Sequence, residues 1–416
     1  MRAKLRCVSC GAEYEVSPKM FSCPKCGGLL EVVLEPEELP PFEEFKRRSR
    51  MRGIWRFKEL LPLEAEEPVT MGEGNTPLIR LERLEKVIGV RRLYAKFEGA
   101  NPTGSFKDRG MSLAVTVAKK IKAKAVVAAS TGNTAASAAA YSARAGLKTF
   151  LILPSGKVAL GKLAQSLLHG AVVVELEDNF DAALEAVKRL SQLEEFYPLN
   201  SFNPWRLEGQ KTLAFELFEE IGVPDVVIVP VGNAGNISAI WKGFKELKNF
   251  GYSASLPKMV GVQAEGASPI ASAYKAGLKA PLFTDSPETV ATAIRIGKPV
   301  NWMKAWRAVE ESGGTFEKVS DTEIIRAQRL LAREEGVAAE PAGAASLAGL
   351  IKLASQGYFN GDEEVVIVVT GHGLKDPDSV KFHPTKRIKS LSVEDAVEKV
   401  RAALIKERAE ADSGAQ

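Results

Sequence analysis

The segment NPTGSFKDRG, residues 101–110, decides how the rest of the sequence is interpreted. Its Asn-Pro-Thr-Gly part favours a turn, and residues 110–120 behind it have the composition of a helix. Lys107 thus comes close to the beginning of a helix, where the positive end of the backbone dipole disfavours a cation. A partly buried lysine in such a place has a lowered pKa, and its neutral amine is a nucleophile. For this segment alone, an ordinary solvated lysine is the alternative.

On both sides of this segment, short apolar runs alternate with helix-length segments. Strands are predicted at residues 93–97, 125–129, 149–153, 172–176, 226–231, 259–263 and 365–369. Helices are predicted at residues 134–145, 180–193, 209–221, 237–248, 322–335 and 393–409. Because β-branched strands alternate with helices, the pattern predicts an α/β fold with mainly parallel sheets.

Composition and charge exclude several classes of protein. The 416 residues include 45% hydrophobic and 26% charged residues, and 56 basic against 52 acidic residues give a net charge of +4. This balance gives no reason to expect a nucleic-acid partner, and no apolar run reaches the ~20 residues that span a bilayer. The first residues lack the apolar core of a signal peptide, so we expect a cytoplasmic protein. The basic run within residues 43–58 is interpreted as a solvated helix that covers the next domain.

All four cysteines lie near the N-terminus. Cys7, Cys10, Cys23 and Cys26 have the spacing C-x2-C-x12-C-x2-C. Two such pairs are typical of a tetrahedral zinc site, and four thiolates leave no open position for catalysis. The spacing therefore predicts a structural zinc-ribbon-like module over residues 1–33.

Three polar loops follow predicted strands, and ligands gather at the carboxyl ends of parallel strands. Ser130-Thr131-Gly132-Asn133-Thr134 offers hydroxyls and backbone N–H groups at a helix start, which suits a carboxylate. Gly232-Asn233-Ala234-Gly235-Asn236 is neither a Walker A loop nor a dinucleotide fingerprint, and suits a monophosphate held by backbone N–H groups. Thr370 follows the last strand and offers a neutral hydroxyl.

A lysine nucleophile, a phosphate loop and a neutral hydroxyl together describe a pyridoxal phosphate (PLP) site. Lys107 would form the Schiff base, residues 232–236 would bind the 5′-phosphate, and Thr370 would face the ring nitrogen. His372 is one of three histidines and receives no catalytic role.

The motifs closely resemble those of the threonine synthases, PLP enzymes of fold type II, the tryptophan synthase β type. The resemblance runs from about residue 74, in EGNTPL (residues 73–78), to residue 378, and the other matching pieces are NPTGSFKDRG, STGNT, NSFNPWRLEGQ, PVGNAGN, EPAGAAS and TGHGLKDPD. The resemblance implies two open, mainly parallel-sheet domains besides the four-cysteine module. We expect a large domain from residues 34–98 and 206–390, a small domain from residues 99–205, and a C-terminal helix and tail over residues 391–416.

The resemblance also implies roles for single residues. Asn133 would bind the 3′-oxygen of the cofactor, while Ser130, Thr131 and Thr134 would bind the carboxylate of the substrate. Ser201 and Arg206 would bind the phosphate of the substrate. The implied reaction converts O-phospho-L-homoserine and water to L-threonine and phosphate, in a homodimer.

Other functions stay open at this point. A related PLP lyase or synthase could use phosphoserine and sulfite, as cysteate synthase does, or act as a threonine dehydratase. A substrate that is shorter by one methylene differs by only about 1–3 kcal/mol of binding energy. A more distant alternative is a zinc-ribbon protein that binds nucleic acid through an inactive enzyme body. The module could instead pack on the enzyme body or on a partner subunit.

Overall fold

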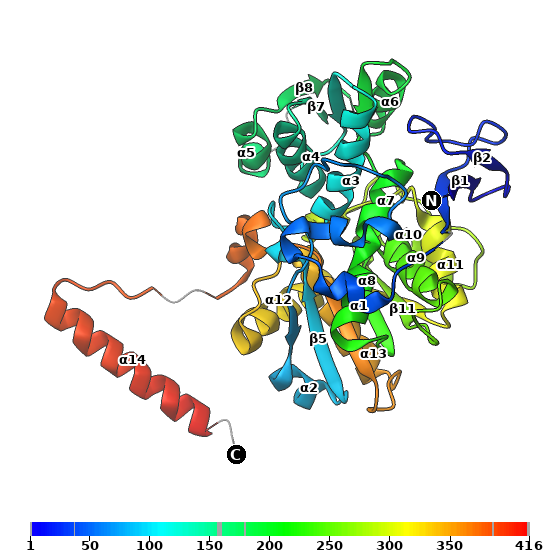
Figure 1. The fold of residues 1–416 in the computed structure, drawn as a ribbon. Helices are drawn as coiled ribbons and strands as arrows, with labels where there is room; N and C mark the ends of the chain where they lie inside the picture. Colours follow the sequence, from blue (N-terminus) through cyan, green and yellow to red (C-terminus); the bar gives the residue numbers. More distant parts are fainter. Residues whose placement is uncertain (1, 37, 156–159, 179, 385–386, 414–416) are drawn as a thin grey trace. The chain divides into compact units, whose positions relative to one another are not determined.

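The computed structural model describes residues 2–36, 38–155, 160–178, 180–384 and 387–413 (Figure 1). The chain forms two compact units, Met1–Ser379 and Val380–Gln416. The first unit contains three sheets, and the second contains one long helix. Within the described residues, no helix is long and apolar enough to cross a membrane.

The largest sheet has six strands in the order β12-β11-β10-β13-β5-β4. Its members are β4 (Leu78–Arg80), β5 (Arg92–Phe97), β10 (Val226–Pro230), β11 (Lys258–Ala264), β12 (Thr315–Val319) and β13 (Glu364–Val369). All neighbours pair in parallel except β4, which pairs with β5 in the antiparallel sense. Both faces of this sheet are buried: Val366 and Val368 of β13 enter one core, and Val365 and Ile367 enter the other.

Helices cover the two faces of the six-stranded sheet. The first face packs on α8 (Thr212–Ile221), α9 (Gly235–Asn249), α10 (Pro269–Lys275) and α11 (Trp302–Glu311). The second packs on α2 (Glu82–Ile88), α12 (Asp321–Glu335) and α13 (Pro341–Ser355). Short 3-10 segments are η1 (Arg50–Leu60), η2 (Glu98–Ala100), η3 (Glu265–Ala267), η4 (Thr292–Ile294), η5 (Gly373–Lys375) and η6 (Pro377–Phe382).

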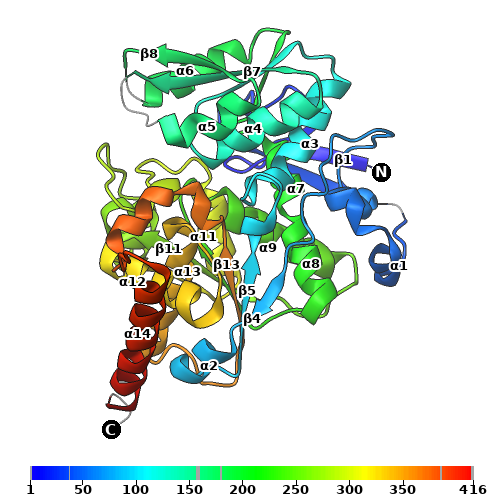
Figure 2. The same ribbon diagram turned by 90° about the vertical axis from the view of Figure 1, so that its left-hand side faces the viewer.

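The second sheet has four parallel strands in the order β8-β7-β6-β9 (Figure 2). Its strands are β6 (Ala125–Ala128), β7 (Lys148–Pro154), β8 (Val172–Leu176) and β9 (Phe196–Pro198). The helices around it are α3 (Lys107–Lys120), α4 (Asn133–Arg144), α5 (Leu160–Leu168) and α6 (Phe180–Leu190). Its core includes Val126 and Val127 of β6 together with the alanine-rich face of α4.

The third sheet is small and antiparallel, in the order β2-β1-β3. It consists of β1 (Arg2–Cys7), β2 (Glu13–Glu15) and β3 (Leu30–Glu35). Its core contains Leu5, Leu30 and Val32 beside Cys7 and Cys23. We call residues 2–35 the four-cysteine module.

The seven predicted strands are confirmed, and so is the α/β class with two mainly parallel sheets. The predicted helix at 209–221 is wrong at its start, because α7 (Pro204–Gln210) already contains residues 209 and 210, and α8 begins after Lys211. The basic run does not form one solvated helix: α1 (Phe42–Arg47) and η1 bury Phe45 and Trp55. The strand β12 was not predicted, because its Glu317 and Lys318 interrupt the apolar run.

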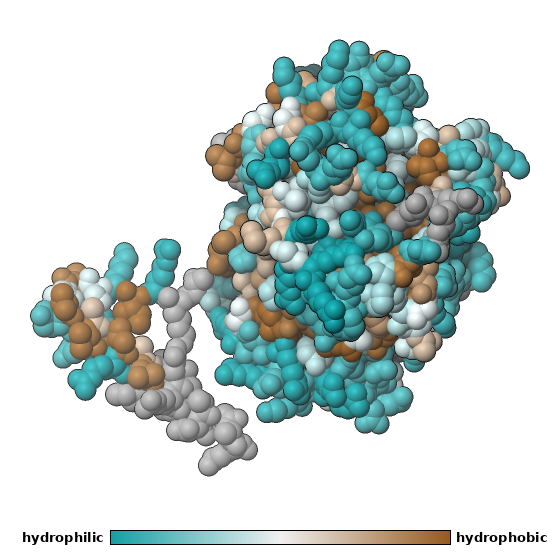
Figure 3. Space-filling model, in the orientation of Figure 1, coloured by the Kyte–Doolittle hydropathy of each residue, from teal (hydrophilic) through white to brown (hydrophobic). Residues whose placement is uncertain are grey.

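The second unit is described by itself. Its helix α14 (Val393–Ser413) confirms the helix predicted at 393–409. The backbone N–H of Asp395 donates to Ser392 Oγ at 3.2 Å, which supports the start of the helix. The apolar side chains at helical spacing are largely exposed on it, as the brown atoms of Figure 3 show for this helix. These side chains are Val393, Val397, Val400 and Leu404.

Candidate active site

Two glycines bring α3 and α7 into backbone contact. A Cβ atom on Gly110 would lie 2.6 Å from the carbonyl oxygen of Arg206, and one on Gly209 would lie 2.0 Å from that of Arg109. Any larger residue at either position would push the helices apart, because real Cβ atoms do not come so close. This contact brings the helix that begins with Lys107 beside the helix that carries Arg206.

Asp108 holds the turn in front of Lys107. Its carboxylate accepts from the N–H and the hydroxyl of Thr103 at 2.7 and 2.6 Å, and from Ser137 Oγ of α4 at 2.5 Å. Burial raises the pKa of this carboxyl to about 6 despite these donors. Gly104 has a φ of +84°, which favours glycine there. The segment NPTGSFKDRG therefore forms the predicted turn and helix start, with α3 beginning at Lys107 itself.

The same turn is bonded to the loop after β13. The N–H of Phe106 donates to the carbonyl of Thr370 at 3.1 Å, and the N–H of His372 donates to the carbonyl of Gly104 at 2.9 Å. His372 thus contributes a backbone hydrogen bond next to Lys107. Residues more than 260 positions apart in the sequence are fixed to one another next to Lys107.

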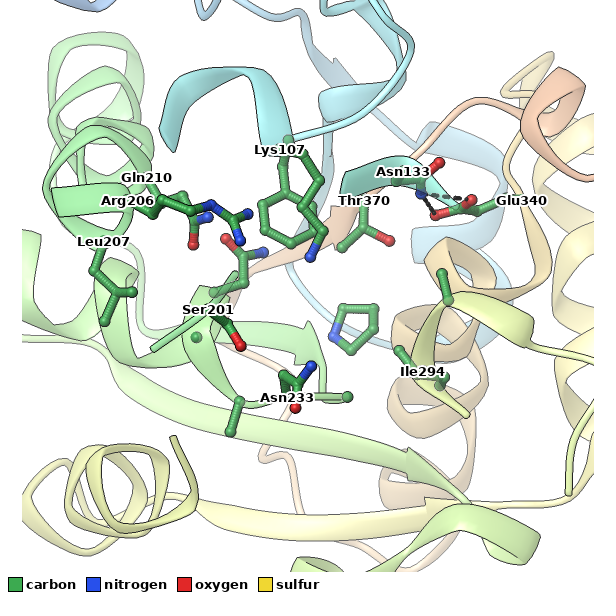
Figure 4. Close-up of a pocket in the computed structure, with 17 residues that line it drawn as sticks. Lys107, Asn133, Ser201, Arg206, Leu207, Gln210, Asn233, Ile294, Glu340 and Thr370 are labelled. Atoms are coloured by element: carbon green, nitrogen blue, oxygen red, sulfur yellow. Dashed lines mark hydrogen bonds between the residues drawn. The ribbon is translucent and has the colours of Figure 1, made fainter. Parts of the chain in front are cut away.

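These elements line a pocket that is partly open to solvent (Figure 4). Lys107 points into its centre, with Arg206 on one side and Thr370 on the other. The predicted residues that line it are Lys107, Asn133, Ser201, Arg206, Gly232, Asn233, Ala234, Gly235, Asn236 and Thr370. The others predicted for the substrate lie outside its lining, in the loop before α4 and the first turn of that helix; they are Ser130, Thr131 and Thr134.

Lys107 has the electrostatic setting of a neutral amine. Burial, followed by the positive charge of Arg206, lowers the pKa of Lys107 to about 7. Glu340 acts in the opposite direction but more weakly. Among the described residues, no carboxylate lies within ion-pair distance of its Nζ, which lies 4.1 Å from the centre of the Phe106 ring. A large share of the amines is therefore unprotonated near neutral pH.

Arg206 is a buried guanidinium whose charge has no carboxylate partner in the described part of the chain. Its Nη1 donates to the carbonyl of Leu199 at 3.1 Å, and its Nε has no hydrogen-bond partner there. Burial lowers the pKa of Arg206 to about 10, so the group stays charged at neutral pH. Buried charges are normally paired, so this one fits an anionic ligand.

The predicted phosphate loop joins β10 to α9 and lies at the bottom of the pocket. Ala234 has a φ of +64°, and α9 begins directly after it at Gly235. A Cβ atom on Gly232 would lie 3.1 Å from the Cα of Ile294, so a side chain there would crowd the opposite wall. The amide group of Asn236 is buried with neither atom hydrogen-bonded among the described residues. The N-terminus of α9 and the unused Nδ2 donor of Asn236 suit a phosphate.

Sequence reasoning missed Glu340 as a member of the site. It precedes α13, is almost completely buried, and accepts from Asn133 Nδ2 at 3.0 Å through each of its carboxylate oxygens. Burial raises the pKa of Glu340. The signal was present in the motif EPAGAAS, where an acidic residue introduces a helix of small apolar residues. Gln210, which lines the pocket, was missed as well, and its side-chain oxygen is buried without a partner in the described residues.

The four cysteines come together as the spacing predicted. Their sulfur atoms all lie within 4.8 Å of one another, with Cys7 and Cys26 at 3.5 Å and Cys10 and Cys23 at 3.7 Å. Zn–S bonds of about 2.3 Å in a tetrahedron separate sulfurs by about 3.8 Å, so the donor set fits zinc. Although burial opposes it, the hydroxyl of Tyr14 at 3.1 Å helps to lower the pKa of Cys23 to about 6, which favours the thiolate.

Comparison with known proteins identifies the class. Residues 69–371 match the family described as pyridoxal-phosphate dependent enzyme, which covers well over half of the chain. The chain therefore belongs to this family, and the two sheets and the pocket just described lie largely within the matched region.

The particular group follows from curated relatives. A threonine synthase of Methanocaldococcus jannaschii is 54% identical over 378 residues, which are 90% of this chain and 93% of that protein. A threonine synthase of Methanosarcina acetivorans is 52% identical with the same shares. Within the PLP-dependent family, the chain is thus a member of the threonine synthases, as the motifs predicted.

Solved structures agree on the fold. Maize serine racemase is 21% identical with a TM-score of 0.62, and the match covers 80% of this chain and 94% of that one. Threonine deaminase isoform 2 of Solanum lycopersicum is 22% identical with a TM-score of 0.62, over 74% and 88% of the two chains. The predicted fold type II of PLP enzymes is confirmed.

Proposed function

We propose that this enzyme converts O-phospho-L-homoserine and water to L-threonine and phosphate. The observation that carries the proposal is a pocket lined by three groups: Lys107, whose pKa is lowered to about 7, a phosphate-type loop, and the Arg206 guanidinium, which has no carboxylate partner among the described residues. The threonine synthase name of relatives with 52% and 54% identity supports the same reaction. We also propose the large domain from residues 34–98 and 206–390 and the small domain from residues 99–205. Strands before residue 98 and after residue 206 share one sheet, which supports this division.

Bound PLP supplies an aldehyde that joins an amine covalently and a ring that acidifies the neighbouring C–H bonds. Lys107 would hold it through Nζ, and the N–H groups of residues 232–236 would bind its phosphate. Asn133 would donate to the 3′-oxygen, and the hydroxyl of Thr370 would face the ring nitrogen. A neutral hydroxyl does not keep that nitrogen protonated, unlike a carboxylate.

The remaining groups of the pocket would handle the substrate. Ser130, Thr131 and Thr134 would bind its carboxylate, and Ser201 and Arg206 its phosphate. Lys107 Nζ would remove the proton from the α-carbon and then one from the β-carbon, as a general base with a pKa close to the working pH. Phosphate would leave from the γ-carbon, Lys107 Nζ would return one proton to the γ-carbon and one to the α-carbon, and water would add its hydroxyl at the β-carbon and its proton to the amine.

Three further assignments belong to this proposal. Zn²⁺ would be bound by Cys7, Cys10, Cys23 and Cys26 as a structural ion, and metal analysis of the purified protein tests it. A homodimer is proposed because the family resemblance implies it, and light scattering on the eluting protein tests it. We also propose a cytoplasmic location.

The deciding experiment measures phosphate release and threonine formation by the PLP-loaded enzyme with O-phospho-L-homoserine. We expect one threonine per phosphate. O-phospho-L-serine with sulfite serves as the comparison substrate, and product analysis separates 2-oxobutanoate, a dehydratase product, from threonine. Greater turnover of phosphoserine, or 2-oxobutanoate as the main product, would refute the proposal.

A further inference from the structure

The four-cysteine module contacts the two helices that border the anion side of the pocket. The ammonium of Lys242 on α9 donates to the carbonyl of Val32 in β3 and also to the carboxylate of Glu208 on α7. Glu208 lies two residues after Arg206 and is almost fully buried. One ammonium group thus joins the backbone of the module to the helix that carries the unpaired guanidinium.

The helix α11 makes the second contact. Arg307 Nη2 donates to the carbonyl of Val8 at 2.7 Å, and Lys304 Nζ donates to the carbonyl of Leu30 at 3.1 Å. Asn301, just before this helix, donates through Nδ2 to the carbonyl of Ser201 at 3.0 Å and through its N–H to the carbonyl of Asn233 at 3.1 Å. Through α11 the module therefore reaches Ser201, one of the two proposed substrate-phosphate residues, and the cofactor loop at Asn233.

The module also lies against the four-stranded sheet. Lys19 Nζ donates to the carbonyls of Leu193 and Glu194 at 2.9 and 2.8 Å. The ring of Phe21 meets that of Tyr197, which belongs to β9, edge to face at 5.6 Å. The module is thus held at three places around the segment that contains Ser201 and Arg206, and Figure 1 shows it beside α9 and α11.

Several of these contacts involve buried charged groups, which tolerate little displacement from their partners. Lys211 pairs with Glu208 and Glu246 at 2.7 Å each, so the carboxylate of Glu208 is shared by two ammonium groups. Burial lowers the pKa of Lys304 to about 8, with Glu31 opposing this shift. Moving β3 away would leave buried charges and carbonyls without partners, a cost that opposes displacement.

We propose that Lys242 and Arg307 are positioning residues, through which the four-cysteine module sets the place of Arg206 and Ser201 and thereby the affinity for the substrate phosphate. The inference rests on the proposed role of Arg206 and on the proposed metal, which would keep the module folded. A module of this size depends on a metal for its own stability.

The test compares variants of the PLP-loaded enzyme by calorimetric binding of inorganic phosphate and by steady-state kinetics. In Lys242→Met, we expect the Kd for phosphate and the KM for O-phospho-L-homoserine to rise about two- to thirty-fold, with a smaller change in kcat. The visible band of the bound cofactor should stay unchanged. Arg307→Gln, a change at a largely exposed side chain, should act in the same direction.

Lys245→Met is the matched control, because Lys245 lies on the same helix and pairs with Glu311 at an exposed site. Its phosphate affinity should equal that of the wild type. Removal of the metal by a chelator can be followed with a colorimetric indicator. It should weaken phosphate binding in the wild type and add little in the double variant Lys242→Met/Arg307→Gln, which lacks both proposed routes.

Unchanged phosphate affinity in Arg307→Gln and in Lys242→Met would overturn the proposal, and if Lys242→Met does not fold, Arg307→Gln decides alone. An additive effect of metal removal in the double variant Lys242→Met/Arg307→Gln would also contradict the proposal. Arg206→Met separates the two proposals. Suppose that the wild type does not turn over O-phospho-L-homoserine but binds phosphate, and that Arg206→Met does not bind it. The proposed reaction then fails, while the positioning role can still be measured through phosphate binding.

Discussion

Two cations on α3, only two positions apart, have opposite surroundings. Arg109 donates through Nε to Glu98 at 2.7 Å and through Nη1 to Glu216 at 2.7 Å, all three side chains being completely or almost completely buried. Lys107 faces a pocket and has no such partner among the described residues. The pairing raises the pKa of Arg109, although burial opposes this, whereas burial and Arg206 lower that of Lys107. A charge used for stability is paired, and a group used for chemistry is left without a partner.

The largest effect is expected for Lys107→Ala. Turnover of O-phospho-L-homoserine should fall by about 10²- to 10⁴-fold, the usual contribution of a general acid–base group, or more because the covalent link to the cofactor is lost too. The absorbance of protein-bound PLP should lose its lysine-linked band, while the cofactor-free variant should keep the cooperative thermal unfolding of a folded protein. Wild-type turnover with an unchanged band would contradict the role of Lys107.

Arg109→Met tests the second cation of the comparison, and the quantity measured is stability. It leaves the carboxylates of Glu98 and Glu216 buried with less positive charge, so the free energy of unfolding should fall by about 3–5 kcal/mol. The control is Arg189→Met, which removes an exposed pair with Glu185 and should cost less than about 1 kcal/mol. Urea unfolding of both variants measures the difference. Equal losses in the free energy of unfolding would show that the buried cluster around Arg109 contributes no more to stability than an exposed ion pair.

Sequence could predict the parts of this comparison that lie within one local motif. Lys107 and residues 232–236 follow turn and glycine patterns whose physical reasons are local. The pairing of Arg109 with Glu216 could not be predicted, because 107 positions separate the two residues. The same holds for Glu340 and Asn133, which are 207 positions apart.

Helix boundaries and packing show the same limit. The break between α7 and α8 and the backbone contact at Gly110 and Gly209 depend on which helix packs on which, and a single sequence does not state this. The cysteine spacing predicted the cluster of sulfurs. It did not predict the carbonyls of Val8 and Val32 as acceptors for cations of the enzyme body, since backbone acceptors have no sequence signature.

The lowered pKa of Lys107 predicts a pH dependence of stability in the protein freed of its cofactor. The folded pKa of about 7 lies below the ordinary value of 10.5, so between these values the unfolded chain binds more protons than the folded one. The stability of the wild type should therefore rise relative to Lys107→Met as the pH increases from 7 to 10. The slope should be well below the limit of about 1.4 kcal/mol per pH unit, because the pocket admits water. Parallel curves from urea unfolding at each pH would contradict the lowered pKa.

The smallest effect is expected for Glu340→Gln in the same pocket as Lys107. This substitution keeps the shape of the side chain and removes its charge. A glutamine has one accepting oxygen where the carboxylate uses two, so the amide of Asn133 loses one hydrogen bond and some of its fixed orientation. A net contribution of about 0.5–1.5 kcal/mol for such a bond predicts a two- to twelve-fold weaker affinity for PLP. Fluorescence titration of the cofactor-free protein measures it, with Glu334→Gln as a control, since the side chain of Glu334 is 45% exposed on α12. Equal PLP affinities in the two variants would mean that Glu340 stabilises the start of α13 and leaves the orientation of Asn133 to other contacts.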